Sequence, residues 1–181
     1  MESIARQPQM IAALATALTA AAIDVRTRRI PNLMVVGGAG AGLLLNTWFD
    51  GSAGLLRSTL GLMVGFSVFL PFFALRGLGG GDVKLMAALG ACLGALAILK
   101  IALIASFVGA ACVLFVATRR GLLRRTLRDV VRLLDGWLTH GPRADENLSL
   151  ANAAALKIAY APPIAAGALF IVFSALWGGS P

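Results

Sequence analysis

Two aspartates lie at the edges of apolar runs in a chain that otherwise has few acids. Asp24 follows the run Ile4–Ile23, and Asp82 comes just before the run Leu85–Leu99. A carboxylate so close to lipid is energetically unfavourable, so it is a functional-site hypothesis by default. Two carboxyls that face each other can share one proton and activate a water molecule, as in aspartic proteolysis. Asp24 and Asp82 are therefore the candidate catalytic pair.

Each aspartate also has an ordinary explanation when it is considered alone. Asp24 could form an interfacial ion pair with Arg26 or another arginine of the short segment that follows it. Asp82 could cap the next helix, because a run of three glycines, 79–81, provides a turn just before it. The same glycines could instead allow a substrate backbone to approach closely. Only the pairing of the two segments favours catalysis.

The composition indicates an integral membrane protein. Hydrophobic residues make up 59% of the 181 residues, charged residues make up 13%, and the mean hydropathy is +0.85. A net charge of +8 could indicate nucleic-acid binding, but the basic residues flank apolar runs, as the positive-inside rule expects. We therefore expect a lipid bilayer around the chain and no nucleic-acid partner.

Six apolar runs predict an all-α fold, a polytopic transmembrane helix bundle with about six spans. Several runs are shorter than the roughly 20 residues of a full crossing, so some helices could be tilted or partly re-entrant. Between residues 85 and 118 only Lys100 interrupts the apolar sequence, and we place a boundary there. The predicted runs are Ile4–Ile23, Leu33–Phe49, Leu60–Leu75, Leu85–Leu99, Ile101–Thr118 and Ile158–Trp177.

The positions of the basic residues predict the topology. If residues 85–118 form a hairpin, thirteen of the sixteen Lys and Arg residues fall on one side of the membrane. The positive-inside rule then predicts six crossings with both ends of the chain outside, and Asp24 and Asp82 both on the cytoplasmic side. The thirteen residues are Arg26, Arg28, Arg29, Arg76, Lys84, Arg119, Arg120, Arg124, Arg125, Arg128, Arg132, Arg143 and Lys157.

Residues Gly121–Leu138 predict an amphipathic helix. Leucines and valines recur there at helical spacing, with arginines and two aspartates between them. We expect this helix to lie on the cytoplasmic leaflet with its arginines near anionic headgroups. A helix that docks a partner or recruits substrate is the alternative. No repeat or linker divides the sequence, so we expect one membrane-embedded domain over residues 1–181.

The cysteines and the histidine do not form a recognisable metal site. Cys92 and Cys112 lie inside apolar runs, with no Cys-x-x-Cys motif and no nearby histidine. Such cysteines are typically small packing residues. His140 is a lone histidine in a polar segment. We therefore expect neither a metal nor a cofactor.

The residues around the two aspartates form two motifs. The first is Asp-x-Arg-x-x-x-Ile-Pro-Asn, made by Asp24, Arg26, Ile30, Pro31 and Asn32. The second is Gly-x-Gly-Asp-x-Lys, made by Gly79, Gly81, Asp82 and Lys84. Together they resemble the two aspartate motifs of the type IV prepilin peptidase family, which belongs to the GxGD intramembrane aspartyl proteases. The resemblance continues through 85–90 and 160–167 and covers most of the chain.

The resemblance implies an aspartic endopeptidase of the inner membrane. It would remove the positively charged leader of a prepilin or pseudopilin at the cytoplasmic face, after a glycine that precedes the apolar helix of the substrate. Asp24 and Asp82 would be catalytic. Lys84 and Arg26 could tune which aspartate stays ionised or could anchor helix ends at the interface. The motif residues expected to support the site are Arg26, Pro31, Asn32, Gly79, Gly81 and Lys84.

The sequence departs from the larger, bifunctional members of that family. It shows no N-terminal cytoplasmic domain and no paired Cys-x-x-Cys zinc site. We therefore expect no N-methyltransferase activity. The chain looks more like the short, TadV/CpaA-like members that serve Flp/Tad-type pili.

Two hypotheses from other classes remain open at this point. The first is a small proton-coupled membrane carrier that uses Asp24 and Asp82 as relay carboxylates. Carriers usually hold such groups near the bilayer midplane, between paired halves, and no half-repeat is evident here. The second is a structural assembly subunit that docks through the helix predicted at Gly121–Leu138.

Overall fold

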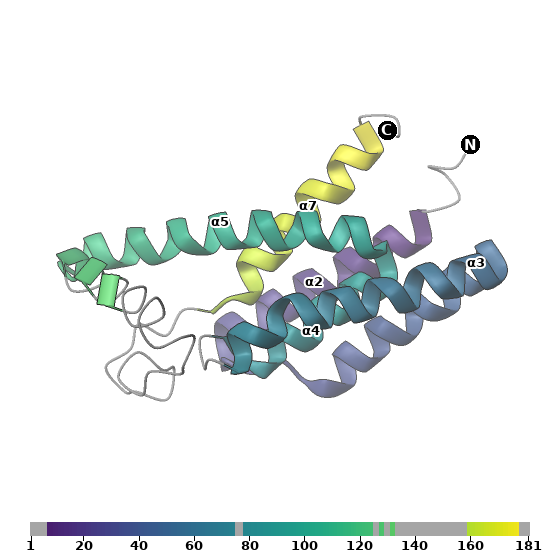
Figure 1. Ribbon diagram of the computed structural model, residues 1–181, viewed down its shortest axis with the longest axis horizontal. Coiled ribbons are helices and arrows are strands. Elements are labelled where there is room, and N and C mark those ends of the chain that lie inside the picture. Colours follow the sequence, from purple (N-terminus) through teal and green to yellow (C-terminus); the bar gives the residue numbers. More distant parts are fainter. Residues whose placement is uncertain (1–6, 75–77, 125–126, 129–130, 133–158, 178–181) are drawn as a thin grey trace.

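The computed structural model describes residues 7–74, 78–124, 127–128, 131–132 and 159–177. Throughout these ranges every regular element is a helix, which confirms the all-α prediction. The helices run back and forth along the long axis of the molecule, while α7 crosses it at an incline (Figure 1). They are α2 (Gln7–Thr27), α3 (Asn32–Ala74), α4 (Gly80–Leu93), α5 (Ala95–Arg119) and α7 (Ala161–Trp177).

Helix α3 is a hairpin of two helical arms, because Gly51 breaks it. Gly51 has φ 59° and ψ −138°, a conformation that a residue with a side chain rarely adopts. The two arms, residues 32–50 and 52–74, lie against each other (Figure 1). Gly54 makes this approach possible, since an added Cβ there would lie 1.9 Å from the Asn46 carbonyl oxygen. The runs predicted at 33–49 and 60–75 fall in these two arms.

The boundary between the next two helices lies at Gly94, so the predicted boundary at Lys100 is wrong. Gly94 has φ 86°, and its N–H donates to the Gly90 carbonyl at 2.8 Å to close α4. The Gly94 carbonyl then accepts from the Ile98 N–H at 3.1 Å as α5 begins. Lys100 lies inside α5. The backbone freedom of glycine therefore determines the break, and the lone charge does not.

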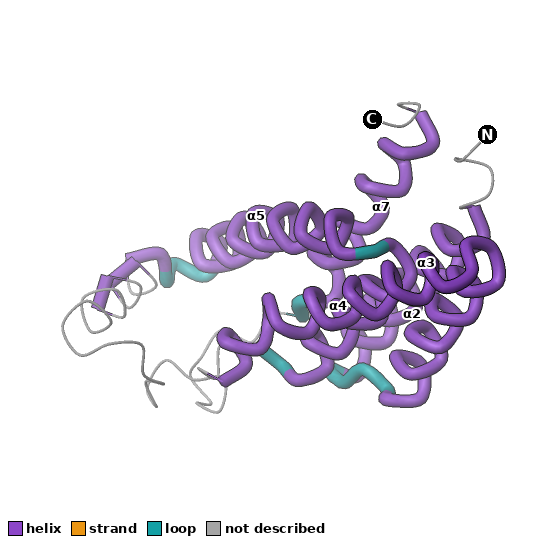
Figure 2. Tube along the Cα trace, turned by 45° about the vertical axis from the view of Figure 1, so that its right-hand side comes forward, coloured by secondary structure: helices purple, strands orange, loops and turns teal. Residues whose placement is uncertain are grey.

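Helix α4 is the centre of the bundle. It contacts α2, α3, α5 and α7, and all of its residues from Leu85 to Cys92 are buried. Its closest neighbour is the second arm of α3, where Gly61 and Gly90 bring the two backbones together (Figure 2). A Cβ on Gly61 would lie 2.0 Å from the Gly90 carbonyl oxygen. Small residues at such contacts are the usual way in which helices approach closely in lipid.

A buried polar cluster holds the C-terminal end of α4. The Asn46 amide donates to the carbonyl oxygens of Ala91 and Cys92 at 3.0 and 3.1 Å. The Ser58 hydroxyl also donates to the Ala91 carbonyl. These carbonyls end a helix and have no partner within it, so side chains of α3 replace water there.

Three helices, α2, α3 and α5, are long and apolar enough to cross a membrane. Large apolar side chains are exposed on the outer surface, among them Phe107 and Phe170, as expected for surfaces in contact with lipid. The fold is therefore that of a membrane protein, and the count of six crossings stays a prediction. Of the amphipathic helix predicted at 121–138, residues 123–124, 127–128 and 131–132 are helical, and positions 125–126, 129–130 and 133–138 lie outside the described residues.

Candidate active site

Asp24 lies in the last turns of α2, with only 7% of its surface exposed. The helix continues past it to Thr27, so Asp24 is inside the helix and not in the loop after it. One of its carboxylate oxygens, Oδ2, accepts a hydrogen bond from the backbone N–H of Ala161 at 3.3 Å. Ala161 begins α7, 137 positions later in the chain. The start of α7 therefore orients this carboxylate.

Asp82 lies in the first turn of α4 and is 8% exposed. Gly79 caps this helix in an extended conformation, with φ −76° and ψ 145°. The Asp82 N–H donates to the Gly79 carbonyl at 3.1 Å, which sets the first turn. Since the N-terminus of a helix carries partial positive charge, it is a favourable place for a carboxylate.

Both carboxyls line the same pocket, which has a volume of about 320 Å³. The walls come from the end of α2, the segment that joins α2 to α3, and the glycine turn that opens α4. In the part of the chain that the structure describes, no three His, Cys, Asp or Glu side chains gather to hold a metal ion. The lining residues are Asp24, Arg28, Arg29, Ile30, Asn32, Gly79, Gly80, Gly81 and Asp82.

The pocket changes the acidity of Asp82, which lies ahead of the apolar run that begins at Leu85. Burial, and after it the negative charge of Asp24, raises the pKa of the Asp82 carboxyl from 3.8 to about 7. A hydrogen bond from the backbone of Gly79 acts in the opposite direction and lowers this pKa. A carboxyl with such a pKa is partly protonated at neutral pH. It can therefore donate a proton, while the negatively charged Asp24 beside it can accept one.

A side chain at any of the three glycines of the turn would be tightly placed against a neighbouring side chain. A Cβ on Gly81 would lie 3.2 Å from the Ile30 side chain, and one on Gly80 would lie 3.3 Å from the Phe73 ring. A Cβ on Gly79 would lie 3.2 Å from Oδ2 of Asp82. The absence of side chains thus lets the turn pass close to the segment between α2 and α3 and leaves the Asp82 carboxylate accessible.

The supporting motif residues fall into two groups. Lys84 donates from Nζ to Oδ1 of Asn32 at 2.9 Å, which connects the start of α4 to the start of α3. Asn32, Gly79 and Gly81 line the pocket. Arg26 and Pro31 are exposed and do not line it.

Several residues of the site were not among those singled out from the sequence. Arg28 and Arg29 line the pocket, and Arg28 has φ 54°, which is unusual for a residue with a side chain. The Ala161 N–H is the other omission. The only sequence signal for it was the 160–167 stretch, which contributed to the resemblance but carried no assigned role. A backbone donor has no characteristic spacing from a distant aspartate, whereas Arg28 and Arg29 follow Asp24 closely and were considered only as ion-pair partners.

Comparison with known proteins places the chain in a family. The model of the Type IV leader peptidase family matches residues 11–114. A "Prepilin leader peptidase/N-methyltransferase" of Burkholderia pseudomallei is 38% identical over 117 residues, which are 61% of this chain and 37% of that protein. One of Dickeya chrysanthemi is 41% identical over 96 residues, which are 49% of this chain and 34% of that protein.

The chain thus spans little more than a third of the length of these curated relatives. No solved structure matches it. The family match begins within α2 and ends within α5, and it includes both aspartates. Because that match covers more than half of the sequence, the chain belongs to the Type IV leader peptidase family.

Proposed function

We propose that this protein is a membrane aspartic endopeptidase that removes the leader of prepilins or pseudopilins. The observation that carries the proposal is the pair of buried carboxyls, Asp24 and Asp82, in one polar pocket. Relatives named as prepilin leader peptidases support the substrate class. A Flp/Tad-type prepilin is the substrate that we expect.

The mechanism follows from the raised pKa of the Asp82 carboxyl and from the second carboxyl, Asp24, in the same pocket. A water molecule between the carboxyls attacks the scissile carbonyl carbon, and its proton moves to the Asp24 carboxylate. Asp82 gives its proton to the carbonyl oxygen, which leaves a neutral tetrahedral diol. When the C–N bond breaks, Asp24 gives its proton to the leaving amine and Asp82 regains one from the diol. The pair returns to its starting state without a covalent intermediate.

The glycine turn suits a substrate that is cut after a glycine. Gly79, Gly80 and Gly81 line the pocket next to Asp82, and none of them projects a side chain into it. An extended peptide backbone can approach such a strip closely. A side chain on the residue before the scissile bond would occupy that space, so a glycine there fits best.

We infer that the pocket opens toward the cytoplasm and that six helical segments cross the membrane. The pocket lies where α2 ends and where α3 and α4 begin, and α5 ends toward the same side of the molecule (Figure 1). Basic residues gather at these helix ends and in the segment that joins α2 to α3: Arg26, Arg28, Arg29, Lys84 and Arg119. Such an accumulation of basic residues is typical of the cytoplasmic side.

The proposal is tested with the isosteric variants Asp24→Asn and Asp82→Asn. Each protein is co-expressed with a Flp-type prepilin, and the leader is followed by electrophoretic mobility and mass spectrometry. We expect each variant to insert normally and to leave the prepilin uncut. Asp50→Asn is the matched control, because Asp50 is a carboxylate that pairs with Arg57 and does not line the pocket. Normal leader removal by either pocket variant would refute the proposal.

A further inference from the structure

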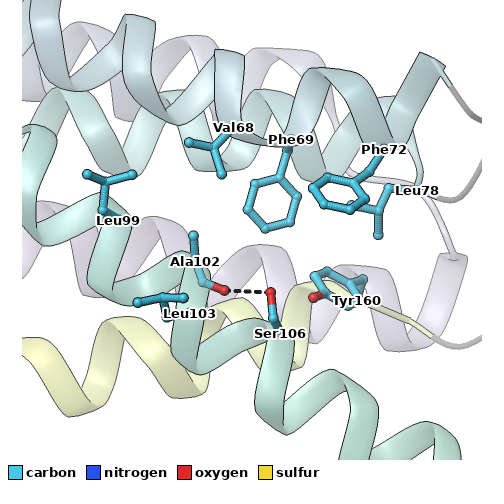
Figure 3. Close-up of a pocket in the computed structure, with 9 residues that line it drawn as sticks. All are labelled: Val68, Phe69, Phe72, Leu78, Leu99, Ala102, Leu103, Ser106 and Tyr160. Atoms are coloured by element: carbon cyan, nitrogen blue, oxygen red, sulfur yellow. Dashed lines mark hydrogen bonds between the residues drawn. The ribbon is translucent and has the colours of Figure 1, made fainter. Parts of the chain in front are cut away.

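A second, apolar pocket lies beside the candidate active site. It has a volume of about 450 Å³ and lies between the second arm of α3, α5 and the residue that precedes α7 (Figure 3). Among the described residues that line it, only Ser106 and Tyr160 have polar side chains, and both hydroxyls donate to backbone carbonyls of α5, at 2.8 and 3.2 Å. The lining residues are Val68, Phe69, Phe72, Leu78, Leu99, Ala102, Leu103, Ser106 and Tyr160.

Two pairs of neighbouring residues place this pocket next to the pocket of the aspartates. Leu78 lines the apolar pocket, and Gly79, the next residue, lines the polar one. Tyr160 lines the apolar pocket, and Ala161, the next residue, donates its N–H to Asp24. The two pockets therefore share a wall, and a peptide bound at the carboxyls would have the apolar pocket next to it.

The apolar pocket is closed on its inner side and open on its outer side. Phe69 is only 3% exposed, and its ring lies 6.1 Å from the ring of Tyr160. Phe72 and Leu103, by contrast, are 51% and 63% exposed. The exposed part of the lining therefore belongs to α3 and α5, two helices that contact each other and then diverge toward the C-terminal end of α5 (Figure 2). Apolar side chains can therefore enter sideways, from the hydrocarbon phase.

We propose that this pocket binds the apolar residues that follow the scissile bond in the substrate helix. The inference rests on the proposed peptidase function. A cavity of about 150 Å³ lined by Leu, Ile and Phe holds a benzene molecule, so 450 Å³ has room for more than one large side chain. A substrate with a basic leader and an apolar helix would place the leader beyond the carboxyls and the start of the helix in this pocket. A lipid acyl chain is the competing occupant.

Disulfide cross-linking in membranes tests the occupant directly. The enzyme carries Asp82→Asn to retain the substrate, Cys92→Ala and Cys112→Ala to remove native thiols, and Ser106→Cys in the pocket. The prepilin carries single cysteines along the first turns of its apolar helix. We expect a disulfide with one or two adjacent helix positions.

The matched control for cross-linking is Ala111→Cys. Ala111 is exposed on the same helix, does not line the pocket, and lies about half a turn round from Ala102 at 100° per residue. We expect no disulfide there. Cross-linking at Ala111→Cys but not at Ser106→Cys would overturn the inference. If no disulfide forms at either position, the inference is also overturned, and lipid is left as the occupant of the pocket.

A kinetic test fills the pocket. Ala102 is 6% exposed and lines the pocket, so Ala102→Phe should displace the substrate side chains. We expect KM for the full prepilin to rise about 10-fold or more with little change in kcat, because the lost contact binds ground state and transition state alike. Ala111→Phe should leave KM unchanged. Equal KM values for both variants would overturn the inference, and cross-linking remains decisive if Ala102→Phe does not insert.

The two proposals fail in different ways. Leader removal that survives Asp82→Asn would refute the peptidase mechanism, whatever occupies the apolar pocket. A different result would refute only the substrate pocket. In that case leader removal requires both aspartates, Ala102→Phe does not affect it, and no disulfide forms at Ser106→Cys.

Discussion

Asp82→Asn should make the protein more stable at neutral pH while it abolishes leader removal. The structure buries the Asp82 carboxyl beside the negative charge of Asp24, and both effects disfavour its ionised form. Asparagine keeps the size of the side chain but never carries a charge. The cost of ionising a buried carboxyl next to another carboxylate is therefore absent from the variant.

The sign and the size of the effect follow from the two pKa values. Between pH 3.8 and about 7 the folded protein retains the Asp82 proton, whereas the unfolded chain has released it. Folding stability must then fall as the pH rises through this window. The difference of about three pH units corresponds to roughly 4 kcal/mol at 1.36 kcal/mol per unit, as an upper value at pH 7 and above. In Asp82→Asn this loss disappears.

Thermal unfolding in detergent micelles at pH 5 and pH 8 measures the effect. We expect the midpoint of the wild-type protein to fall between the two pH values more than that of Asp82→Asn, and the variant to be the more stable protein at pH 8. Asp50→Asn serves as the control, since Asp50 is 34% exposed in its ion pair and its removal should bring no gain. The same pH dependence in wild type and Asp82→Asn would refute the reasoning.

For catalysis, kcat/KM should decline as the pH rises through about 7, because the proton that Asp82 donates is lost.

Three further predictions concern the packing and the product. Gly61→Ala should destabilise the protein by about 2 kcal/mol or more, because the added Cβ would lie 2.0 Å from the Gly90 carbonyl oxygen. Gly37→Ala is the control and should be neutral, since its Cβ would have nothing within 4 Å; thermal unfolding of both variants tests this. Asn46→Ala should cost about 1–3 kcal/mol, because the buried Cys92 carbonyl at the end of α4 loses its side-chain donor, whereas Ser58 still donates to the Ala91 carbonyl; unchanged stability in the same assay would contradict that role. If the chain removes prepilin leaders as proposed, its product should carry an unmethylated N-terminus, and a mass increase of one methyl group would contradict the expectation.

The all-helical fold was predictable because lipid imposes strong rules on the sequence. A chain in hydrocarbon must satisfy its backbone hydrogen bonds internally, so long apolar runs form helices. The run at 101–118 accordingly falls within α5, and the run at 4–23 overlaps α2. The basic residues carry topological information in the same direct way, because Lys and Arg accumulate in the loops on the cytoplasmic side.

The break within residues 85–118 was not predictable from hydropathy. The apolar character is nearly continuous there, and a single lysine looks like the natural boundary. The chain turns at Gly94 because the end of α4 is held by Asn46 and Ser58 of α3, and because glycine adopts the required positive φ. Neither cause is visible within the segment itself.

The candidate aspartates show the same division between local and long-range information. Residue type and position beside lipid were enough to single out Asp24 and Asp82, because the energetic cost of a carboxylate at such a position is a local property. Their surroundings depend on helices that meet far apart in sequence: the Ala161 N–H reaches Asp24, and Lys84 reaches Asn32. The packing of α4 against α3 likewise depends on residues far apart in sequence, because these backbones come close only where glycines leave side chains absent. The identity of the acids was therefore readable from the chain, whereas the acidity of Asp82 and the apolar pocket beside it arise only when the helices pack.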